Sequence, residues 1–538
     1  DTVKTGNNGF YYFLLEAADL SLNDEVLVYI DGDSTNANTV TSAGANGLTS
    51  LDLYGDYLIV RHDTGSSLTN AQLGNAHYTD SGDVIYSVTG NDLDLEAGLY
   101  IWASDTYAPG GNINLTGSWT NAGTFTAGSN TVTFDGTGSQ SITSGGDSFY
   151  NLTINKASGT AVLIDALEVE NDLTITSGTL DTGSENDVEI GGNVDVDGIL
   201  TANESAITVG GNWDSSSGTF NSGESAVVFE GEDTTLNTGG SSFAYIEIEK
   251  DNSSNTFTLI GNDLTISEIL AINSGTLIQG NLNIIVSNSE EDELAIEIGE
   301  DGRWTNNGTG NLTLGGDVSN EGSITFNNSN IFIRSSVEEV QRNWQGEGTF
   351  SITGANVKDQ SCTGNTPAYI KVINGTDSGG NSQWLFSTGE AISGTVYYSD
   401  GSTAVSSGVT LNFYLYHASS STLRLSTTVL AGGAYSFTDL GLSDGDLVNI
   451  YLEHRIFDGV VAAKLSGDSI SDLHIYNNHV IIRNESSTPI TNADLANAKD
   501  SEGNMGCYSI DEADLTVTQN MDLLLWDNST YTPSGSIG

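Results

Sequence analysis

Apolar residues between positions 115 and 386 occur as short triplets in which the middle residue is usually polar. Alternation with a period of two, bounded by turn-forming Gly, Asn, Ser and Asp, indicates β-strands. The triplets recur every 15 to 21 residues, at 152–154, 173–175, 188–190, 207–209, 227–229, 246–248, 264–266 and 282–284. Several short strands in a repeat of this length predict a β-solenoid.

Each coil of such a solenoid buries its inner face and pairs its backbone only by stacking on its neighbours. Proline is therefore expected to be rare, and Pro367 is the only one in this stretch. Roughly thirteen coils spaced about 4.8 Å apart would give a rod about 60 Å long. The preference of parallel crossovers predicts a right-handed helix.

A longer repeat of 94 residues lies over the coils, and its equivalent pairs are Trp119/Trp213, Phe149/Phe243 and Lys156/Lys250. A catalytic group is normally unique, whereas a repeated residue normally belongs to the scaffold. We therefore expect the two lysines to occupy one structural position. The tryptophans, including Trp304 and Trp344, either fill the solenoid core or form a stripe that stacks on sugars, and the core is favoured.

The two ends of the chain carry copies of one module. Residues 58–61, 68–76, 99–102 and 106–109 match residues 480–483, 490–498, 523–526 and 530–533, at an offset of 422 to 424 residues. Upstream, residues 9–13 match residues 433–437, but the second copy has about forty more residues before that point. Residues 1–24 thus correspond only to the last strands of a module, as expected for one period of a longer array.

An incomplete sandwich exposes unpaired strand edges, which either a neighbour completes by strand addition or an upstream segment of the same polypeptide completes. We therefore predict an assembly interface in which strands of the 392–396 type complete the N-terminal segment. Its residues are Thr2, Val3, Phe10, Tyr11, Tyr12, Phe13, Ile392 and Val396.

Residues 391–453 resemble the transthyretin-like β-sandwiches of surface proteins, the carboxypeptidase-regulatory-like and collagen-adhesin B-type modules. The matching features are Gly394 and Val396, the run Gly433, Tyr435 and Phe437, and Gly445-Asp446. No Lys occurs between Lys371 and Lys464, so the isopeptide crosslink of that family is not expected. The solenoid phrases at 117–125 and 149–154 are similar to repeats of large secreted bacterial surface proteins. These resemblances imply export and a surface location.

The predicted fold class is all-β, with a central right-handed parallel β-helix (β-solenoid) flanked by duplicated β-sandwich-type modules. The expected divisions are a partial sandwich at 1–24, a first β module at 25–114, the β-helix at 115–388, the transthyretin-like sandwich at 389–453 and the second module copy at 454–538.

The charge balance limits the classes of molecule that the protein can bind. The chain has 71 acidic residues against 14 Lys and Arg, a net charge of -57. Nucleic acid is excluded because phosphate binding needs dense basic residues, and no apolar run is long enough for membrane insertion. Such self-repulsion suits a saline or calcium-rich exterior. The two cysteines, Cys362 and Cys507, are either incidental thiols or form an inter-chain or inter-domain bridge.

Calcium is the only cofactor that the residues suggest. Asp31 and Asp33 resemble the start of a calcium loop, although position twelve is Ser42 where a Glu is wanted. The densest acidic run is Glu290, Glu291, Asp292 and Glu293. A solvated acidic loop is the plainer interpretation of that run.

We do not expect an enzyme, because residues 115–386 contain no histidine and their lysines repeat. The leading hypothesis is an extracellular structural protein, a unit of a surface fibre or filament that assembles head to tail with itself. The alternative is a surface adhesin that binds glycans on the β-helix face. A polysaccharide lyase or hydrolase is the least favoured class.

Overall fold

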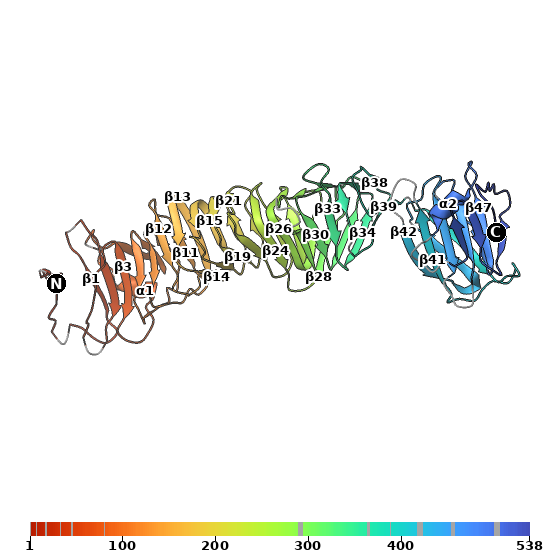
Figure 1. The fold of residues 1–538 in the computed structure, drawn as a ribbon. Coiled ribbons are helices and arrows are strands. Elements are labelled where there is room, and N and C mark those ends of the chain that lie inside the picture. Colours follow the sequence, from red (N-terminus) through yellow and green to blue (C-terminus); the bar gives the residue numbers. More distant parts are fainter. Residues whose placement is uncertain are drawn as a thin grey trace. The chain divides into compact units, whose positions relative to one another are not determined.

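The structure of the chain is a computed structural model (Figure 1). It describes residues 2–6, 8–16, 19–32, 34–44, 47–79, 81–288, 294–362, 366–387, 389–416, 423–438, 440–452, 458–467, 469–499 and 506–538, with only the backbone described at Phe413, Leu423 and Arg424. Strands make up 48% of the chain and helices 3%, as the alternating pattern predicted. The chain forms a β-solenoid of about 21 turns.

The chain divides into two compact units, Asp1–Thr325 and Phe326–Gly538. The strands that begin in the first unit are β1 (Glu25–Tyr29), β2 (Asn38–Ser42), β3 (Tyr57–His62), β4 (Tyr86–Thr89), β5 (Asp92–Leu95), β6 (Gly98–Ile101), β7 (Thr106–Tyr107), β8 (Ile113–Leu115), β9 (Trp119–Asn121), β10 (Thr124–Phe125), β11 (Thr131–Phe134), β12 (Gln140–Thr143), β13 (Asn151–Leu163), β14 (Leu167–Val169), β15 (Leu173–Asp181), β16 (Val188–Ile190), β17 (Val194–Val196), β18 (Ile199–Thr201), β19 (Ala206–Val209), β20 (Trp213–Asp214), β21 (Thr219–Asn221), β22 (Ala226–Phe229), β23 (Thr234–Asn237), β24 (Ser242–Glu249), β25 (Thr256–Ile260), β26 (Leu264–Ile278), β27 (Ile284–Val286), β28 (Leu294–Asn306), β29 (Leu312–Leu314), β30 (Asp317–Asn320) and β31 (Ser323–Asn327).

The strands of the second unit are β32 (Phe332–Ser335), β33 (Arg342–Gln345), β34 (Thr349–Thr353), β35 (Asn356–Lys358), β36 (Gln360–Ser361), β37 (Ile370–Ile373), β38 (Thr376–Asp377), β39 (Trp384–Ser387), β40 (Ala391–Tyr397), β41 (Thr410–Tyr416), β42 (Leu423–Thr428), β43 (Ala434–Thr438), β44 (Leu447–Leu452), β45 (Val460–Lys464), β46 (Ile475–Tyr476), β47 (His479–Asn484), β48 (Tyr508–Asp511), β49 (Asp514–Val517) and β50 (Asp522–Leu525). The helices are α1 (Asn70–Ala76), α2 (Asn492–Ala498) and the 3-10 turn η1 (Ala431–Gly433).

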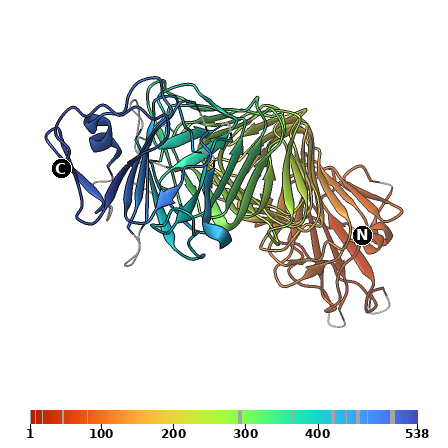
Figure 2. The ribbon, with the colours of Figure 1, turned by 90° about the vertical axis from the view of Figure 1, so that its right-hand side faces the viewer.

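Parallel stacking builds the core of the first unit, where strands of successive coils run side by side (Figure 2). In β14 the buried Leu167 and Val169 flank the exposed Glu168, which is the alternation that the sequence shows. Equivalent apolar residues of successive coils are hydrogen-bonded neighbours, so each coil closes the core of the one before it. One such column is Val188, Ile207, Val227 and Ile246.

The parallel ladder starts earlier than we predicted. β2 pairs in parallel with β3, β3 with β6 and β6 with β9, so Leu58, Leu99 and Trp119 are stacked neighbours. The expected boundary at residues 114/115 therefore lies inside the ladder, and the solenoid has more coils than the thirteen expected. Composition changes at that point, but the pairing does not.

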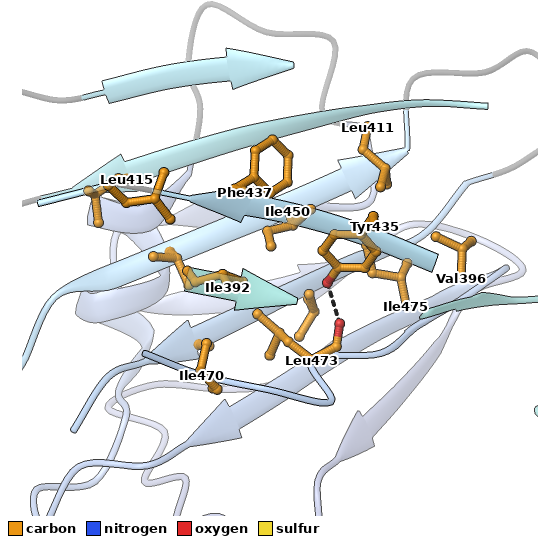
Figure 3. Close-up of a cluster of buried hydrophobic side chains, with 14 of the residues drawn as sticks. Ile392, Val396, Leu411, Leu415, Tyr435, Phe437, Ile450, Ile470, Leu473 and Ile475 are labelled. Carbon is orange, nitrogen blue, oxygen red and sulfur yellow. Dashed lines mark hydrogen bonds between the residues drawn. The ribbon is translucent and has the colours of Figure 1, made fainter. Parts of the chain in front are cut away.

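The second unit contains parallel solenoid strands followed by a sandwich. β32, β35 and β38 form one parallel column, and β34, β37 and β39 form another. One sheet of the sandwich has the order β42-β41-β44-β45-β47-β50 and the other has the order β43-β40-β46. Ile392, Tyr435, Ile450 and Leu473 are among the buried side chains of the core between them (Figure 3).

The predicted boundary at 453/454 lies within the larger sheet of this sandwich. β44 pairs with β45 in antiparallel fashion, and β45 pairs with β47 in parallel. The segment resembling a transthyretin-like module and the second module copy therefore share one core.

Each module copy also contains a short helix, α1 or α2, which the strand pattern did not predict. Thr69 and Thr491 cap these helices, and Gln72 and Asp494 complete the capping boxes. A Thr followed three residues later by an acidic or amide side chain is the sequence signal that would have found them.

Candidate assembly interface in the first module copy

The two copies are built to one plan where they can be compared. Asp446 accepts a hydrogen bond from Ser443 N at 2.8 Å, and the equivalent Asp24 accepts one from Ser21 N at 2.6 Å. The strand that follows is β44 in the second copy and β1 in the first, and each pairs in antiparallel fashion with the next strand. The predicted duplication is thus a duplication of structure.

The surroundings of these two strands differ. β44 lies between β41 and β45, and all six of its residues are buried. Among the described residues, β1 pairs only with β2, and four of its five residues are partly exposed. The side of β1 that corresponds to the β41 side of β44 is therefore a sheet edge that no described strand covers.

The predicted interface residue Tyr11 occupies the position of Tyr435. In the second copy the Tyr435 hydroxyl donates to the backbone oxygen of Leu473 (Figure 3). In the first copy the Tyr11 hydroxyl donates to the backbone oxygen of Leu51, which is the equivalent residue. Burial is the main cause that raises the pKa of Tyr11, which keeps its hydroxyl a donor at neutral pH.

Although Tyr11 is anchored, the described part of residues 2–24 forms no strand. In the second copy the equivalent strand β43 pairs with β40 through Ile392 opposite Phe437 and Gly394 opposite Tyr435. No described strand takes the place of β40 in the first copy. The N-terminal segment therefore lies where the second copy has a sandwich strand, and no described strand pairs with it.

This segment also exposes apolar side chains. Phe10 is 72% exposed, Tyr12 is 69% exposed and Leu14 is 92% exposed. Their equivalents in β43 are Ala434, Ser436 and Thr438, which are small or polar. An extended segment that is apolar on both faces favours a covered position over a free one.

The other predicted interface residues divide between the two copies. Thr2 and Val3 are exposed, and Phe13 lies beside Tyr11 with a ring-centroid distance of 6.0 Å. Ile392 and Val396 are fully buried in the core of the second sandwich. They belong to β40, for which the described residues of the first copy show no counterpart, and they are not a free surface because they are already buried in the second sandwich.

The structure assembles no metal centre from the described residues. No group of three or more His, Cys, Asp or Glu lies close enough together there to hold an ion. Asp31 is exposed, whereas Asp33, Glu290, Glu291, Asp292 and Glu293 lie outside the described residues. The calcium hypothesis therefore stays a prediction.

The repeated lysines lie in one structural position, as predicted. Lys156 Nζ donates to Gly136 O at 2.6 Å and to the Gln140 side chain. Lys250 Nζ donates to Glu230 O at 2.6 Å and to Thr234 Oγ1 at 2.5 Å. Both acceptors lie at the same sequence distance from the lysine, so each ammonium ties its coil to the preceding one.

The four solenoid tryptophans fill the core, as favoured. Trp119, Trp213, Trp304 and Trp344 are almost completely buried. Trp119 packs against Phe125 at 4.7 Å, and Trp213 packs against Phe220 at 4.9 Å between ring centroids. The alternative, a sugar-stacking stripe of these residues, is wrong because their rings face inward.

Two further places on the solenoid were candidates for chemistry. An open hollow lined by Ser177, Gly178, Gly198 and Gly218 contains one carboxylate, Asp197, and no basic or aromatic side chain. The lining of this hollow therefore does not contain the pair of carboxylates that glycoside hydrolysis commonly uses.

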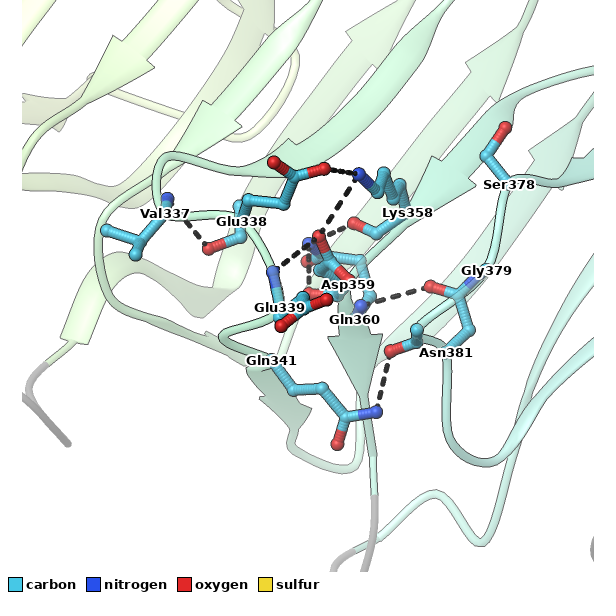
Figure 4. A network of polar contacts seen from close by, with 12 residues as sticks. Val337, Glu338, Glu339, Gln341, Lys358, Asp359, Gln360, Ser378, Gly379 and Asn381 are labelled. Carbon is cyan, nitrogen blue, oxygen red and sulfur yellow. Dashed lines mark hydrogen bonds and ion pairs between the residues drawn. The ribbon is translucent and has the colours of Figure 1, made fainter.

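The second place is a corner network around Lys358 (Figure 4), whose Nζ lies 2.7 Å from Glu338 Oε1 and 3.9 Å from Asp359 Oδ2. The hydrogen bond from Lys358 lowers the pKa of Glu338, which is the wrong direction for a general acid. Asp359 Oδ2 accepts from Glu339 N at 3.2 Å, so the network holds the turn.

Both cysteines are buried free thiols of the second unit. Burial raises the pKa of Cys362 to about 11 and that of Cys507 to about 12. Buried thiols with raised pKa are unreactive. This favours incidental thiols over an inter-chain or inter-domain bridge.

No helix within the described residues is long and apolar enough to cross a membrane. Comparison with known protein families, with characterised proteins and with solved structures finds no match.

Proposed function

We propose that this protein is a structural component of an extracellular fibre or filament, in which solenoid units join head to tail and a neighbouring segment completes the first module copy. The observation that carries the proposal is that the two module copies are open on opposite sides. Among the described strands, each copy pairs on the side where the other copy does not.

The first copy is open on its N-terminal side. β1 has no described partner on its outer edge, whereas the equivalent β44 is covered by β41. Its solenoid side is closed, because β9 stacks on β6.

The second copy is open on its solenoid side. β50, the equivalent of β6, pairs only with β47 among the described strands. Leu525 is 47% exposed and Ile537 is 48% exposed, whereas their equivalents in the first copy, Ile101 and Ile113, are fully buried. Burying the exposed half of each side chain is worth about half of the 1.5–3 kcal/mol of a whole side chain, which supports a partner at this edge.

The proposal is tested by blocking the outer edge of β1. Ile30 N bonds to Ala37 O and Ala43 N bonds to Asp24 O, so alternation directs the N–H of Leu27 away from β2. Leu27→Pro removes that outward donor, while Leu27→Val keeps it. We expect wild type and Leu27→Val to form filaments in electron micrographs and larger species in sedimentation, and Leu27→Pro to stay monomeric with an unchanged circular dichroism spectrum.

A wild-type chain that stays monomeric at about 100 times a Kd of about 1 μM would contradict the proposal. Filaments that form equally well from Leu27→Pro would show that this edge is not the junction.

A further inference from the structure

We propose that the first module copy binds an extended β-strand with the pattern of Ile392–Tyr397, namely apolar, polar, Gly, polar, apolar, aromatic. The binding slot lies between residues 10–14 and residues 51–55. This inference rests on the proposed function and names the chemistry of the strand that fills the junction.

The second copy shows how such a strand is held. β40 pairs in antiparallel fashion with β43 on one side and in parallel with β46 on the other. Leu473 N donates to Ser393 O at 2.9 Å, and Asn477 N donates to Tyr397 O at 3.0 Å. These two backbone donors thus define the register of the strand.

In the first copy, residues 50–56 correspond to the segment 472–478 that pairs with β40 in the second copy. Ser50 and Asp56 have φ of 55° and 61°, and their equivalents Asp472 and Asn478 have φ of 56° and 61°. The backbone therefore takes the same left-handed conformation at both ends of this segment in the two copies. Leu51 and Gly55 correspond to Leu473 and Asn477, and within the described part of the chain their N–H groups donate to no acceptor.

The burial of the side chains differs between the two copies in the same place. Leu473 and Ile475 are fully buried beneath β40, whereas Leu51 and Leu53 are partly exposed. Tyr476 packs against Tyr397 at 5.6 Å between ring centroids. Its equivalent Tyr54 is 37% exposed, so an aromatic residue at the end of the bound strand would cover it as Tyr397 covers Tyr476.

The central glycine is required by close approach. A Cβ at Gly394 would overlap the Leu473 carbonyl oxygen and lie 2.9 Å from Tyr435 Cε1. Tyr11 makes the same hydrogen bond to Leu51 as Tyr435 makes to Leu473. The strand that enters the first slot therefore also needs Gly where it crosses Tyr11.

The side chains on either side of the glycine supply the apolar contacts. Ile392 and Val396 are fully buried in the second sandwich. In the first copy, their equivalents on the bound strand would pack against Phe13 and Leu53, the equivalents of Phe437 and Ile475. Main-chain hydrogen bonds then hold the strand, and the glycine and apolar positions select its sequence.

The test adds a fluorescent peptide of residues 390–398 to the full-length protein. We expect saturable binding and slowed hydrogen exchange at Leu51 and Gly55. A peptide carrying Gly394→Val should bind at least about tenfold more weakly, because its side chain meets backbone and ring atoms that cannot move away.

Two matched protein variants locate the site. Tyr11→Ala should lose peptide binding, whereas Tyr12→Ala, in the same segment but facing outward, should keep it. Absence of binding, equal binding of the Gly394→Val peptide, or loss of binding in Tyr12→Ala alone would overturn the inference. Binding of an oligosaccharide at Tyr54 without competition from the peptide would also overturn the inference, because the bound strand should cover that ring.

The outcome is separable from that of the proposed function. Glycine-dependent peptide binding by a protein that forms no filaments would uphold the slot and reject the filament. Filaments formed by a protein that does not bind the peptide would do the reverse.

Discussion

At the scale of single residues, the solenoid repeats its buried charged side chains as well as its apolar core. Lys250 is buried with its ammonium against Glu230 O, and Lys156 is buried in the equivalent place against Gly136 O. Burial, opposed by the nearby carboxylates of Asp251, Asp233 and Glu230, lowers the pKa of Lys250 to about 8. Because the pKa of a buried lysine differs between the folded and unfolded states, the free energy of unfolding depends on pH.

The stability of the solenoid should rise between pH 8 and about pH 10.4, the ordinary lysine pKa. In this window the unfolded chain holds the Lys250 proton and the folded chain has released it, so raising the pH favours the folded state. Below pH 8 both states are protonated and the full cost of burial is present. Lys250→Met should flatten the slope of the denaturant midpoint against pH, whereas Lys4→Met, at an exposed position, should not. Equal slopes in all three proteins would contradict this.

At the scale of elements, stability comes from contacts between coils. Trp213 is anchored on β20, where its Nε1 donates to Ser215 Oγ at 3.1 Å and its ring packs against Phe220 and Phe243. Trp119 packs against Phe125 and Phe149 in the same manner one long repeat earlier. The 94-residue repeat in the sequence thus corresponds to repeated packing of a tryptophan against two phenylalanines.

Trp213→Ala should destabilise the protein by about 3–5 kcal/mol, because a large cavity opens between coils that stack on both sides. Trp119→Ala should cost a similar amount, since its aromatic neighbours are equivalent. Ile199→Ala, at a position exposed on β18, should cost less than about 1 kcal/mol. Guanidinium unfolding measures all three. A loss below about 1 kcal/mol for either tryptophan variant would mean that the coils close around the vacancy.

At the scale of the whole molecule, a net charge of -57 opposes both compact folding and the approach of a second copy. In the proposed assembly, the open edges of the two module copies attract partners through apolar and backbone groups, so the balance between attraction and charge repulsion depends on salt screening. The screening length falls from about 30 Å at 0.01 M salt to about 8 Å at 0.15 M. Assembly is therefore expected in saline surroundings.

Raising sodium chloride from about 0.01 M to about 0.15 M should raise the thermal unfolding midpoint and increase the fraction of assembled protein. Scanning calorimetry and sedimentation measure the two effects. Calcium chloride at matched ionic strength is the control, because any effect beyond that of sodium reports a specific calcium site. Salt independence would contradict the screening argument.

The alternating pattern, the coil repeat and the duplication were sufficient to predict the parallel solenoid, the inward tryptophans and the shared position of Lys156 and Lys250. These features depend on local periodicity, and stacking a repeated unit on itself leaves few alternatives. The match of residues 9–13 to residues 433–437 was also found from the sequence, because it requires only an alignment of the chain with itself. Completion of the first copy by a neighbour stays a prediction.

Tertiary structure alone decided which strands meet. Ile392 bridges to Ile470, and β44 of the predicted sandwich pairs with β45 of the predicted module, so the boundary between them disappears. Only the folded chain shows that Tyr11 reaches Leu51 as Tyr435 reaches Leu473. Pairing between distant segments depends on which edges the rest of the fold leaves open, and that information is not contained in any local stretch of residues.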